Sequence, residues 1–92
     1  MIYSFRHRGL KRLYERGDPA RLPSDMIQRI EGILAALDVA TQIADLDRPS
    51  YRLHALRGDR QGQWAVTVRA NWRITFRFEE GAVYDVELVD YH

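Results

Sequence analysis

The stretch QWAVTVRANWRITFRF, residues 63–78, decides the fold of this 92-residue chain, because apolar and polar side chains alternate along it on both sides of a short polar loop. Alternation with a period of two is typical of strands that bury one face. We therefore predict two strands, 63–68 and 72–78, that pair as a hairpin. Gathering the apolar side chains on one face requires Val68 to lie opposite Trp72, which leaves a three-residue loop.

The two faces of this hairpin differ in chemistry. The apolar face is predicted to carry Trp64, Val66, Val68, Trp72, Ile74 and Phe76. The opposite face is predicted to carry Thr67, Arg73, Thr75 and Arg77. The second set would make a polar and basic surface. Asn71 in the loop tolerates the left-handed conformation that short hairpin loops often need.

Two further strands are expected to flank the hairpin. Residues 51–56 are predicted to form one of them, and the glycine-bounded turn 58–62 connects it to the hairpin. Residues 82–89 alternate in the same way, with Asp85 and Glu87 on the polar side, and are predicted to form the last strand. The C-terminal half of the chain therefore has the pattern of a small antiparallel sheet.

The N-terminal half is predicted to be mainly helical. A short strand at 3–6 precedes a helix whose apolar residues recur at helical spacing until Gly17, a residue that commonly ends helices. A second helix is expected from Ser24, the predicted N-cap, to about Ala40. The element order β-α-α-β-β-β-β indicates an α+β fold, with two helices on one face of a small antiparallel sheet. The length favours a single domain, 1–92.

Composition excludes several classes of protein. Apolar residues make up 46% of the chain and charged residues 29%, which is typical of a globular protein rather than a disordered one. The chain has no cysteine, and His7, His54 and His92 lack the spacing of metal ligands, so we expect no metal and no cofactor. No apolar stretch is long enough to span a bilayer, and the N-terminus lacks the layout of a signal peptide. A cytoplasmic location is expected.

Charge is segregated along the chain although the formal net charge is only +1. Residues 1–17 carry a net charge of +4 and residues 18–47 one of −4. Residues 48–77 hold seven arginines against Asp59, and residues 78–92 carry a net charge of −5. Arginine binds phosphate through two parallel hydrogen bonds, which lysine cannot do. The basic segment is therefore a candidate phosphate-binding surface, and pairing of its arginines with the acidic segments is the alternative.

The last three residues, Asp90, Tyr91 and His92, place a carboxylate, a phenol and an imidazole at the end of the predicted last strand. Chain ends usually fray, so a solvated tail is the alternative interpretation, but a sheet would hold these residues still. An imidazole that exchanges protons near neutral pH suits general acid-base chemistry. The terminus is therefore a candidate site.

Three residues of the middle of the chain extend this candidate site. His54 and Arg57 lie at the end of the strand predicted at 51–56, and Arg73 lies in the hairpin. The set fits metal-free cleavage of RNA, in which a base removes the 2′-hydroxyl proton, an acid protonates the departing 5′-oxygen, and cations stabilise the phosphoryl charge. A packed imidazole at His54 and a cross-strand contact for Arg73 are the structural alternatives.

Several stretches together resemble the HigB toxins of the RelE/ParE superfamily of bacterial toxin-antitoxin systems. They are SFRHRGLK at 4–11, LHALRGDR at 53–60, WAVTVRANWRITF at 64–76 and VDYH at 89–92, so the resemblance spans nearly the whole chain. It implies a RelE-like fold and a messenger-RNA endonuclease that requires the 70S ribosome and cuts the message in the A site. It also implies a HigA-like helix-turn-helix antitoxin, binding to operator DNA only through the antitoxin complex, and no membrane partner.

The resemblance also implies roles for single residues. The catalytic positions would be His54, Arg57, Arg73, Asp90, Tyr91 and His92. RNA or ribosome binding is expected of Arg6, Arg8, Lys11, Arg12, Arg60, Arg69 and Arg77. The two histidines would share the acid and base work, while Asp90 would orient an imidazole and Tyr91 would position the nucleotide. Position 57 is often lysine in the family, and arginine there keeps the charge but gives up its proton much less readily.

Two other functions are compatible with parts of the sequence. A ParE-like toxin that binds DNA gyrase without cutting RNA would explain the fold and the arginines, but it would leave His54 and the terminal triplet without a role. A small noncatalytic RNA-binding module would need exposed aromatic rings for base stacking. The large aromatic side chains of the hairpin instead fall on its predicted buried face. They are Trp64, Trp72, Phe76 and Phe78.

Overall fold

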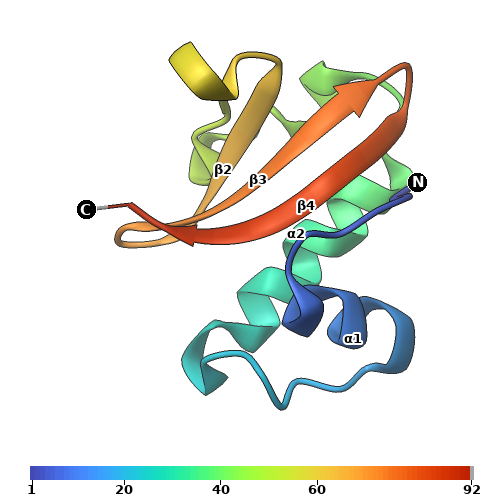
Figure 1. Cartoon of the computed structure of the whole chain (residues 1–92), viewed down its shortest axis with the longest axis vertical. Coiled ribbons are helices and arrows are strands. Elements are labelled where there is room, and N and C mark those ends of the chain that lie inside the picture. Colours follow the sequence, from blue (N-terminus) through green and yellow to red (C-terminus); the bar gives the residue numbers. More distant parts are fainter. Residues whose placement is uncertain (92) are drawn as a thin grey trace.

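The computed structural model describes residues 1–91, and within them four strands form one antiparallel sheet (Figure 1). The strands are β1 (His54–Ala55), β2 (Gln63–Arg69), β3 (Trp72–Glu79) and β4 (Ala82–Asp90), side by side in this order. β1 and β4 are therefore the two edges of the sheet. The N-terminal segment runs along β4 and forms isolated parallel bridges from Ile2 to Val83 and from Phe5 to Val86.

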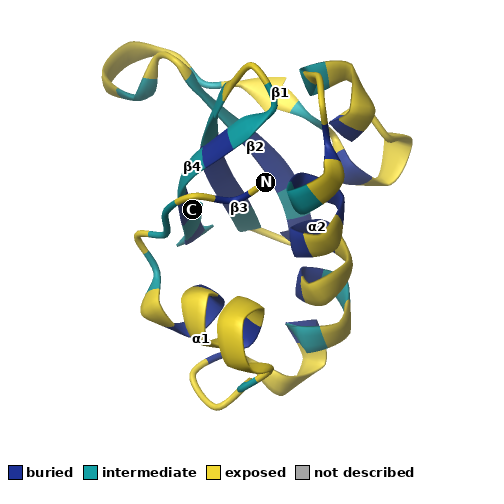
Figure 2. Cartoon of the chain, turned by 90° about the vertical axis from the view of Figure 1, so that its right-hand side faces the viewer, coloured by how far each residue is buried: buried dark blue, intermediate teal, exposed yellow. Residues whose placement is uncertain are grey.

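Two helices, α1 (Arg8–Arg16) and α2 (Ile27–Val39), pack against one face of this sheet. Short 3-10 helices lie in the connections: η1 (Ser24–Met26), η2 (Ile43–Leu46), η3 (Pro49–Tyr51) and η4 (Gly58–Arg60). Figure 2 shows the buried residues lining the surfaces where helices and sheet meet, while the outer surface of α1 is exposed. The predicted α+β architecture is confirmed. In the described part of the chain, every helix is too short or too polar to cross a membrane.

The first helix begins and ends at residues whose side chains or backbone suit those positions. His7 is its N-cap, and the Nδ1 atom of His7 accepts a hydrogen bond of 3.2 Å from the backbone N–H of Leu10. A Cβ at Gly9 would lie 2.9 Å from Cε1 of His7, so glycine leaves room for the capping ring. Gly17 ends the helix in the left-handed conformation with φ of 67°, as the sequence predicts.

The His7 cap makes stability depend on pH. Burial lowers the pKa of His7 below 6.5, and the nearby Glu87 carboxylate only partly opposes this effect. The unfolded chain therefore takes up more protons than the folded one as the pH falls below 6.5, and stability is lost in that range. We expect the melting temperature to fall between about pH 7.5 and pH 5.5, and to fall less in His7→Asn, whose side chain caps without titrating. Thermal unfolding followed by circular dichroism tests this, and equal falls in both proteins would contradict it.

The second helix begins later than the sequence suggests. The interpretation of Ser24 as its N-cap is wrong, because Ser24 lies inside η1 and α2 starts only at Ile27 without a side-chain cap. Pro23 precedes η1 with a φ of −60°, which favours a tight turn at this point. The C-terminal end agrees with the prediction, since Ala40 is the C-cap.

The predicted hairpin register is confirmed away from the turn, where Val66 pairs with Ile74. Near the turn the prediction is wrong, because a β-bulge at Val68 shifts the register by one residue. Arg69, rather than Val68, consequently pairs with Trp72. The apolar residues still share one face, since the bulge adds a residue instead of inverting the strand.

The bulge also changes the loop. Two residues, Ala70 and Asn71, connect the strands, in place of the three that were expected. The residue with positive φ is Ala70, at 46°, so the prediction of a left-handed Asn71 is wrong. One extra residue in β2 moves the position that needs this conformation toward the N-terminus.

Two predicted strands are shorter in the structure. Residues 3–6 contribute an isolated bridge instead of a continuous strand. Only His54 and Ala55 of the predicted strand 51–56 form β1, because η3 ends at Tyr51 and Arg52 adopts the left-handed conformation with φ of 49°. A left-handed residue interrupts the regular extended backbone of a strand.

The core lies between the sheet and the two helices. Fully buried side chains from α1 and α2, such as Leu10 and Ile30, belong to the same core cluster as Phe76 of β3. Trp64 and Trp72 are partly buried and pack against the same cluster. The aromatic side chains of the hairpin therefore lie on the core side, as the sequence predicts.

Thr67 is a local weakness of the sheet. Its buried Oγ1 atom has no hydrogen-bond partner within residues 1–91. An unpaired buried hydroxyl costs about 1–3 kcal/mol, so Thr67→Val should raise the free energy of unfolding by about 1 kcal/mol while keeping the side-chain shape. Urea unfolding measures this change, and Thr67→Ala, which leaves a gap, is the control that should not stabilise. A lower unfolding midpoint for Thr67→Val would refute the assignment.

Candidate active site on the open face of the sheet

The face of the sheet that points away from the two helices carries the predicted site residues His54, Arg73 and Arg77, and we call it the open face. Its residues include His54, Gln63, Ala65, Thr67, Arg73, Thr75, Arg77, Tyr84, Glu87 and Val89. One row crosses all four strands: His54 pairs with Ala65, Ala65 with Thr75, and Thr75 with Glu87. Directly paired residues of antiparallel strands point to the same side. The sheet therefore places His54 and Glu87 at opposite ends of one row.

His54 lies on edge strand β1, and its side chain is exposed. The Nδ1 atom of His54 is 3.0 Å from the backbone carbonyl oxygen of Arg52. Because a carbonyl only accepts hydrogen bonds, Nδ1 is the donor, and in the neutral ring Nε2 is then the unprotonated nitrogen. The ring thus presents a proton acceptor to the solvent.

Arg73 occupies the next open-face position along β3 from Thr75. Its Nη1 atom donates to the backbone carbonyl oxygens of Ala70 at 2.6 Å and of Trp72 at 3.2 Å. Among residues 1–91, Arg73 forms no ion pair. No carboxylate of the described residues therefore cancels its charge, and within residues 1–91 the guanidinium is held in place by backbone atoms.

His54 and Arg73 share a face without touching. Two strand spacings and two residues along a strand separate their Cα atoms, which corresponds to about 12 Å in a flat sheet. Both side chains are long enough to approach a ligand placed between them. Arg57, also exposed, lies two residues after the end of β1, and its backbone carbonyl accepts a hydrogen bond of 3.4 Å from the N–H of Arg60. The structure thus brings an imidazole and a second guanidinium to the β1 edge.

The C-terminal residues lie at the other edge. Asp90 pairs with Trp72, and so by alternation lies on the core side of the sheet rather than on the side of Arg73. The backbone N–H of Tyr91 donates to the carbonyl oxygen of Asn71 at 2.9 Å, which ties the end of the chain to the hairpin loop. His92, a predicted catalytic residue, lies outside the described residues.

The order of strands limits which predicted groups can meet. β4 neighbours β3, so its end lies close to the strand of Arg73, as expected from the sequence. β1 is three strand spacings away, and Asp90 lies three residues along β4 beyond the row of His54, which gives about 18 Å in a flat sheet, so the expected approach of Asp90 and Tyr91 to His54 is not direct. A substrate would have to span the open face to meet both edges.

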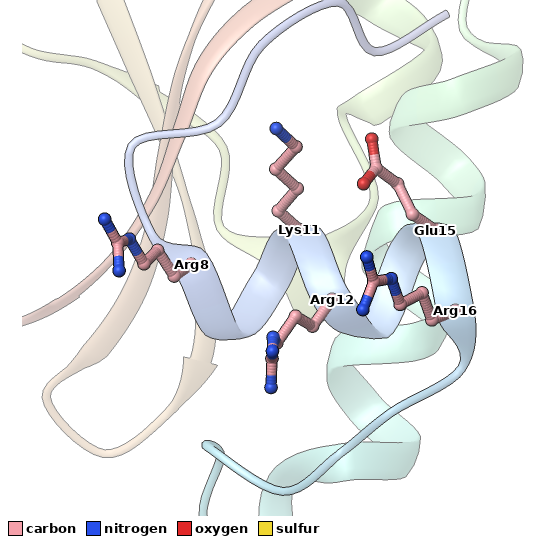
Figure 3. Close-up of a pocket in the computed structure, with 5 residues that line it drawn as sticks. All are labelled: Arg8, Lys11, Arg12, Glu15 and Arg16. Carbon is pink, nitrogen blue, oxygen red and sulfur yellow. The ribbon is translucent and has the colours of Figure 1, made fainter.

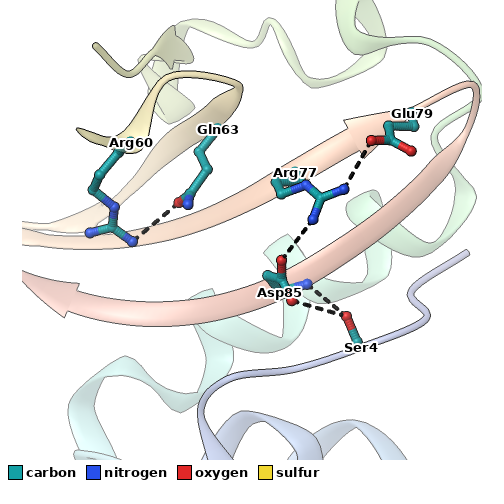
Figure 4. A network of polar contacts seen from close by, with 6 residues as sticks. All are labelled: Ser4, Arg60, Gln63, Arg77, Glu79 and Asp85. Carbon is teal, nitrogen blue, oxygen red and sulfur yellow. Dashed lines mark hydrogen bonds and ion pairs between the residues drawn. The ribbon is translucent and has the colours of Figure 1, made fainter. Parts of the chain in front are cut away.

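The other predicted RNA-binding arginines of the sheet region differ in how they are paired. Arg69 forms an ion pair with Asp25 of η1. Arg77 contacts two carboxylates, those of Glu79 at 2.9 Å and Asp85 at 3.2 Å (Figure 4), and the hydrogen bond with Glu79 raises its pKa. Arg60 donates to side chains of three strands, including Gln63 at 3.2 Å (Figure 4). These arginines are therefore not equally available to a phosphate.

The exposed side of α1 is a second basic region. A shallow hollow of about 230 Å³ is lined by Arg8, Lys11, Arg12, Glu15 and Arg16 (Figure 3). Arg12 also forms an ion pair with Asp18 at 3.6 Å. Arg6, which is exposed, precedes this helix. Four cations around one carboxylate leave this surface positively charged.

Sequence comparison identifies the family. Residues 3–92 match the model of the RelE-like toxin of type II toxin-antitoxin system HigB. The chain is 51% identical over 92 residues to endoribonuclease HigB of Proteus vulgaris, and the alignment covers 100% of both proteins.

Structure comparison gives the same fold. YafQ from Escherichia coli strain BL21(DE3) superposes with a TM-score of 0.66 at 12% identity, over 98% of this chain and 91% of that one. The YoeB-YefM toxin-antitoxin complex from Staphylococcus aureus contains a chain with a TM-score of 0.63 at 13% identity, over 100% and 95% respectively. The family match along nearly the whole sequence and the full-length relative show that this chain belongs to the HigB-like toxins, the RelE-like toxins of type II toxin-antitoxin systems.

Proposed function

We propose that this toxin is a messenger-RNA endoribonuclease that works on the translating ribosome and inhibits growth by destroying messages. Two facts support RNA cleavage: the 51%-identical relative is named an endoribonuclease, and the open face combines an acceptor imidazole with an uncancelled guanidinium. The joint presence of His54 and Arg73 on one face is the observation that carries the proposal.

The proposed reaction needs no nucleophile from the protein, because the 2′-hydroxyl of RNA attacks the adjacent phosphorus. His54 is suited to accept the hydroxyl proton at Nε2, since Nδ1 is engaged with the Arg52 carbonyl oxygen. The bond from phosphorus to the 5′-oxygen then breaks, and that oxygen takes a proton from an acid. The products would be a 2′,3′-cyclic phosphate and a 5′-hydroxyl.

The guanidinium groups would stabilise the negative charge that develops on the phosphoryl oxygens. Arg73 is fixed by two backbone carbonyls before substrate binds, so little reorganisation is required when that charge appears. Arg57 lies at the same edge of the sheet as His54 and would stabilise the phosphoryl charge in the same way. Its guanidinium keeps its proton, so we assign it no proton transfer.

The C-terminal residues complete the proposed site from the opposite edge. His92 would protonate the departing 5′-oxygen. Asp90 lies on the core side of the sheet end, which suits a residue that orients His92 better than one that touches the substrate. Tyr91, whose backbone is tied to Asn71, would hold a nucleotide against the open face.

The separation of the two edges favours dependence on the ribosome. The end of β4 at Asp90 lies three strand spacings and three residues along the strand from His54, about 18 Å in a flat sheet, so a flexible RNA would rarely present one linkage to groups from both edges. A message held and bent in the ribosomal A site would be presented in one conformation, which lowers the entropic cost. The basic side of α1, with Arg6, Arg8, Lys11 and Arg12, would bind ribosomal RNA.

Family membership supports a protein partner. We propose a HigA-like helix-turn-helix antitoxin that neutralises this toxin in the cytoplasm and carries the complex to operator DNA. A structurally similar toxin, YoeB of Staphylococcus aureus, was solved in complex with its antitoxin YefM. The toxin itself would contact the ribosome and its message, and would have no direct contact with the operator.

A reconstituted translation system tests the proposed function. Purified toxin is added to ribosomes with a defined message, and the cut sites are mapped by primer extension, with ribosomes omitted in a parallel reaction. We expect cleavage only with ribosomes. Absence of cleavage in both reactions, together with inhibition of gyrase supercoiling by the same protein, would favour the ParE-like alternative and reject an endoribonuclease.

A further inference from the structure

Arg60 lies over the middle of the open face and is held there by residues from three strands. Its Nη2 atom donates to Oε1 of Gln63 on β2, to Oγ1 of Thr75 on β3 and to Oε2 of Glu87 on β4, each at 3.2 Å. Arg60 and Glu87 are about one-third exposed, so their ion pair is partly shielded from solvent. Arg60 is therefore fixed against the sheet rather than free in solvent.

All three bonds use a single nitrogen. Within residues 1–91, the Nη1 and Nε atoms of Arg60 form no hydrogen bond with protein. Their N–H groups therefore stay available to an anion while Nη2 fixes the side chain. A guanidinium held in this way has lost much of its conformational freedom before a ligand binds.

Arg77 provides the contrast on the same face. Both of its terminal nitrogens contact carboxylates, Nη1 that of Asp85 and Nη2 that of Glu79, so this cluster has a net charge of −1. Arg60 shares its charge with the single carboxylate of Glu87. A phosphate would be repelled by the Arg77 cluster more than by the Arg60 pair.

The Thr75 contact places the head of Arg60 one open-face position along β3 from Arg73. Arg60 contacts the side chain of Thr75, and Arg73 occupies the next open-face position on the same strand. Open-face neighbours along a strand are about 7 Å apart, a distance that two long guanidinium side chains can span around one phosphate. Arg73 carries an uncancelled charge, so Arg60, Arg73 and Glu87 together have a net charge of +1.

We propose that Arg60 and Arg73 form one phosphate-binding subsite for single-stranded RNA, and that Glu87 is the positioning residue of this subsite. Glu87 does not touch the RNA and acts by holding Arg60 over Thr75. The proposal rests on the proposed endoribonuclease function and deepens it. The sequence shows Glu87 only as a polar position of the last strand, because its partner Arg60 comes from a 3-10 helix 27 residues earlier.

A double-mutant cycle tests the coupling of these residues. Single-turnover cleavage of ribosome-bound message is measured against toxin concentration for wild type, Arg60→Ala, Glu87→Ala and the double variant. We expect Arg60→Ala to lower the cleavage efficiency by about 10²-fold, because it removes an oriented cation. Glu87→Ala should lower it by about 10-fold through displacement of Arg60, and should cause no further loss once Arg60 is absent.

Two further variants separate positioning from folding. Glu87→Gln keeps an acceptor for Arg60 and should cleave nearly as well as wild type, which a purely electrostatic role of the carboxylate would not allow. Glu31→Ala removes the same charge from the exposed surface of α2 and should leave cleavage unchanged. Thermal unfolding of each variant identifies any that fail to fold. If Glu87→Ala is one of these, Glu87→Leu, which keeps side-chain bulk but cannot accept a hydrogen bond from Arg60, replaces it in the cycle.

The outcomes are distinguishable. If wild type cleaves but Glu87→Ala cleaves equally well, or if the losses of the two single variants multiply in the double variant, the positioning role is wrong and the endoribonuclease function stands. If wild type itself leaves the ribosome-bound message intact, the proposed function fails and this subsite fails with it. The proposal is supported if Glu87→Ala lowers cleavage only while Arg60 is present, so that the double variant cleaves as efficiently as Arg60→Ala.

Discussion

Replacing either imidazole, by His54→Ala or His92→Ala, is expected to lower the cleavage rate of ribosome-bound message by about 10²- to 10⁴-fold, because each change removes a proposed proton acceptor or donor. Growth inhibition on expression should be lost with it. His54 is exposed, so its replacement removes little of the core. Single-turnover cleavage rates, together with growth curves after induction, measure the effect.

Arg52, two residues before His54, provides the control variant. Arg52→Ala removes a nearby side chain but keeps the backbone carbonyl that orients the imidazole, so cleavage should be close to wild type. Deletion of Tyr91 and His92 should abolish toxicity like His92→Ala while leaving the circular dichroism spectrum unchanged. Full toxicity of any imidazole variant would remove that residue from the site.

Arg73→Ala is expected to lower cleavage by about 10²- to 10³-fold, the usual cost of losing one preorganised donor to a developing oxyanion. Association with the ribosome-bound message should also weaken. The slope of the logarithm of affinity against the logarithm of salt concentration should become less steep by the amount expected for about one phosphate contact. The physical reason is that the Arg73 charge is not cancelled by a carboxylate within residues 1–91. Binding measured at several salt concentrations gives the slope.

Arg21 offers the matched control for Arg73. It is exposed in the connection between α1 and α2, away from the open face. Arg21→Ala removes the same charge and should leave both the cleavage rate and the salt slope near those of wild type. A loss in Arg73→Ala that does not change with salt would instead indicate a packing role for its contacts with the hairpin backbone.

Much of the fold follows from local patterns. The alternation around Val66 and Ile74 predicts the hairpin and its core face, because one buried face leaves a single register open. Gly17 predicts the end of α1 for an equally local reason. The bulge at Val68 and the left-handed Arg52, which shortens β1, leave no comparable trace, because tertiary packing selects them.

The candidate site was predictable as a set of residues but not as an arrangement. The sequence shows that the segment 48–77 is rich in arginine, but it does not show which arginines are neutralised. Arg69 pairs with Asp25 from η1, whereas Arg73 binds only backbone oxygens among the described residues. Such differences depend on contacts between residues distant in sequence, which folding alone creates.

Strand order was the other feature beyond the reach of local patterns. The sequence places His54 and Asp90 at ends of strands and suggests that these ends approach one another. The structure puts the two strands at opposite edges, with β2 and β3 between them. This arrangement turns a compact predicted cluster into a site that extends across a face, and it is the physical basis for expecting the ribosome to hold the substrate.

Attack by the 2′-hydroxyl of the message across the open face is the step on which the proposed function depends most. The most direct test uses a ribosome-bound message with a single 2′-deoxyribose at the nucleotide 5′ of the mapped cut. We predict that the unmodified message yields a 2′,3′-cyclic phosphate and that the deoxy message remains intact at that position. Cleavage of the deoxy message at the same site and at an undiminished rate would contradict it.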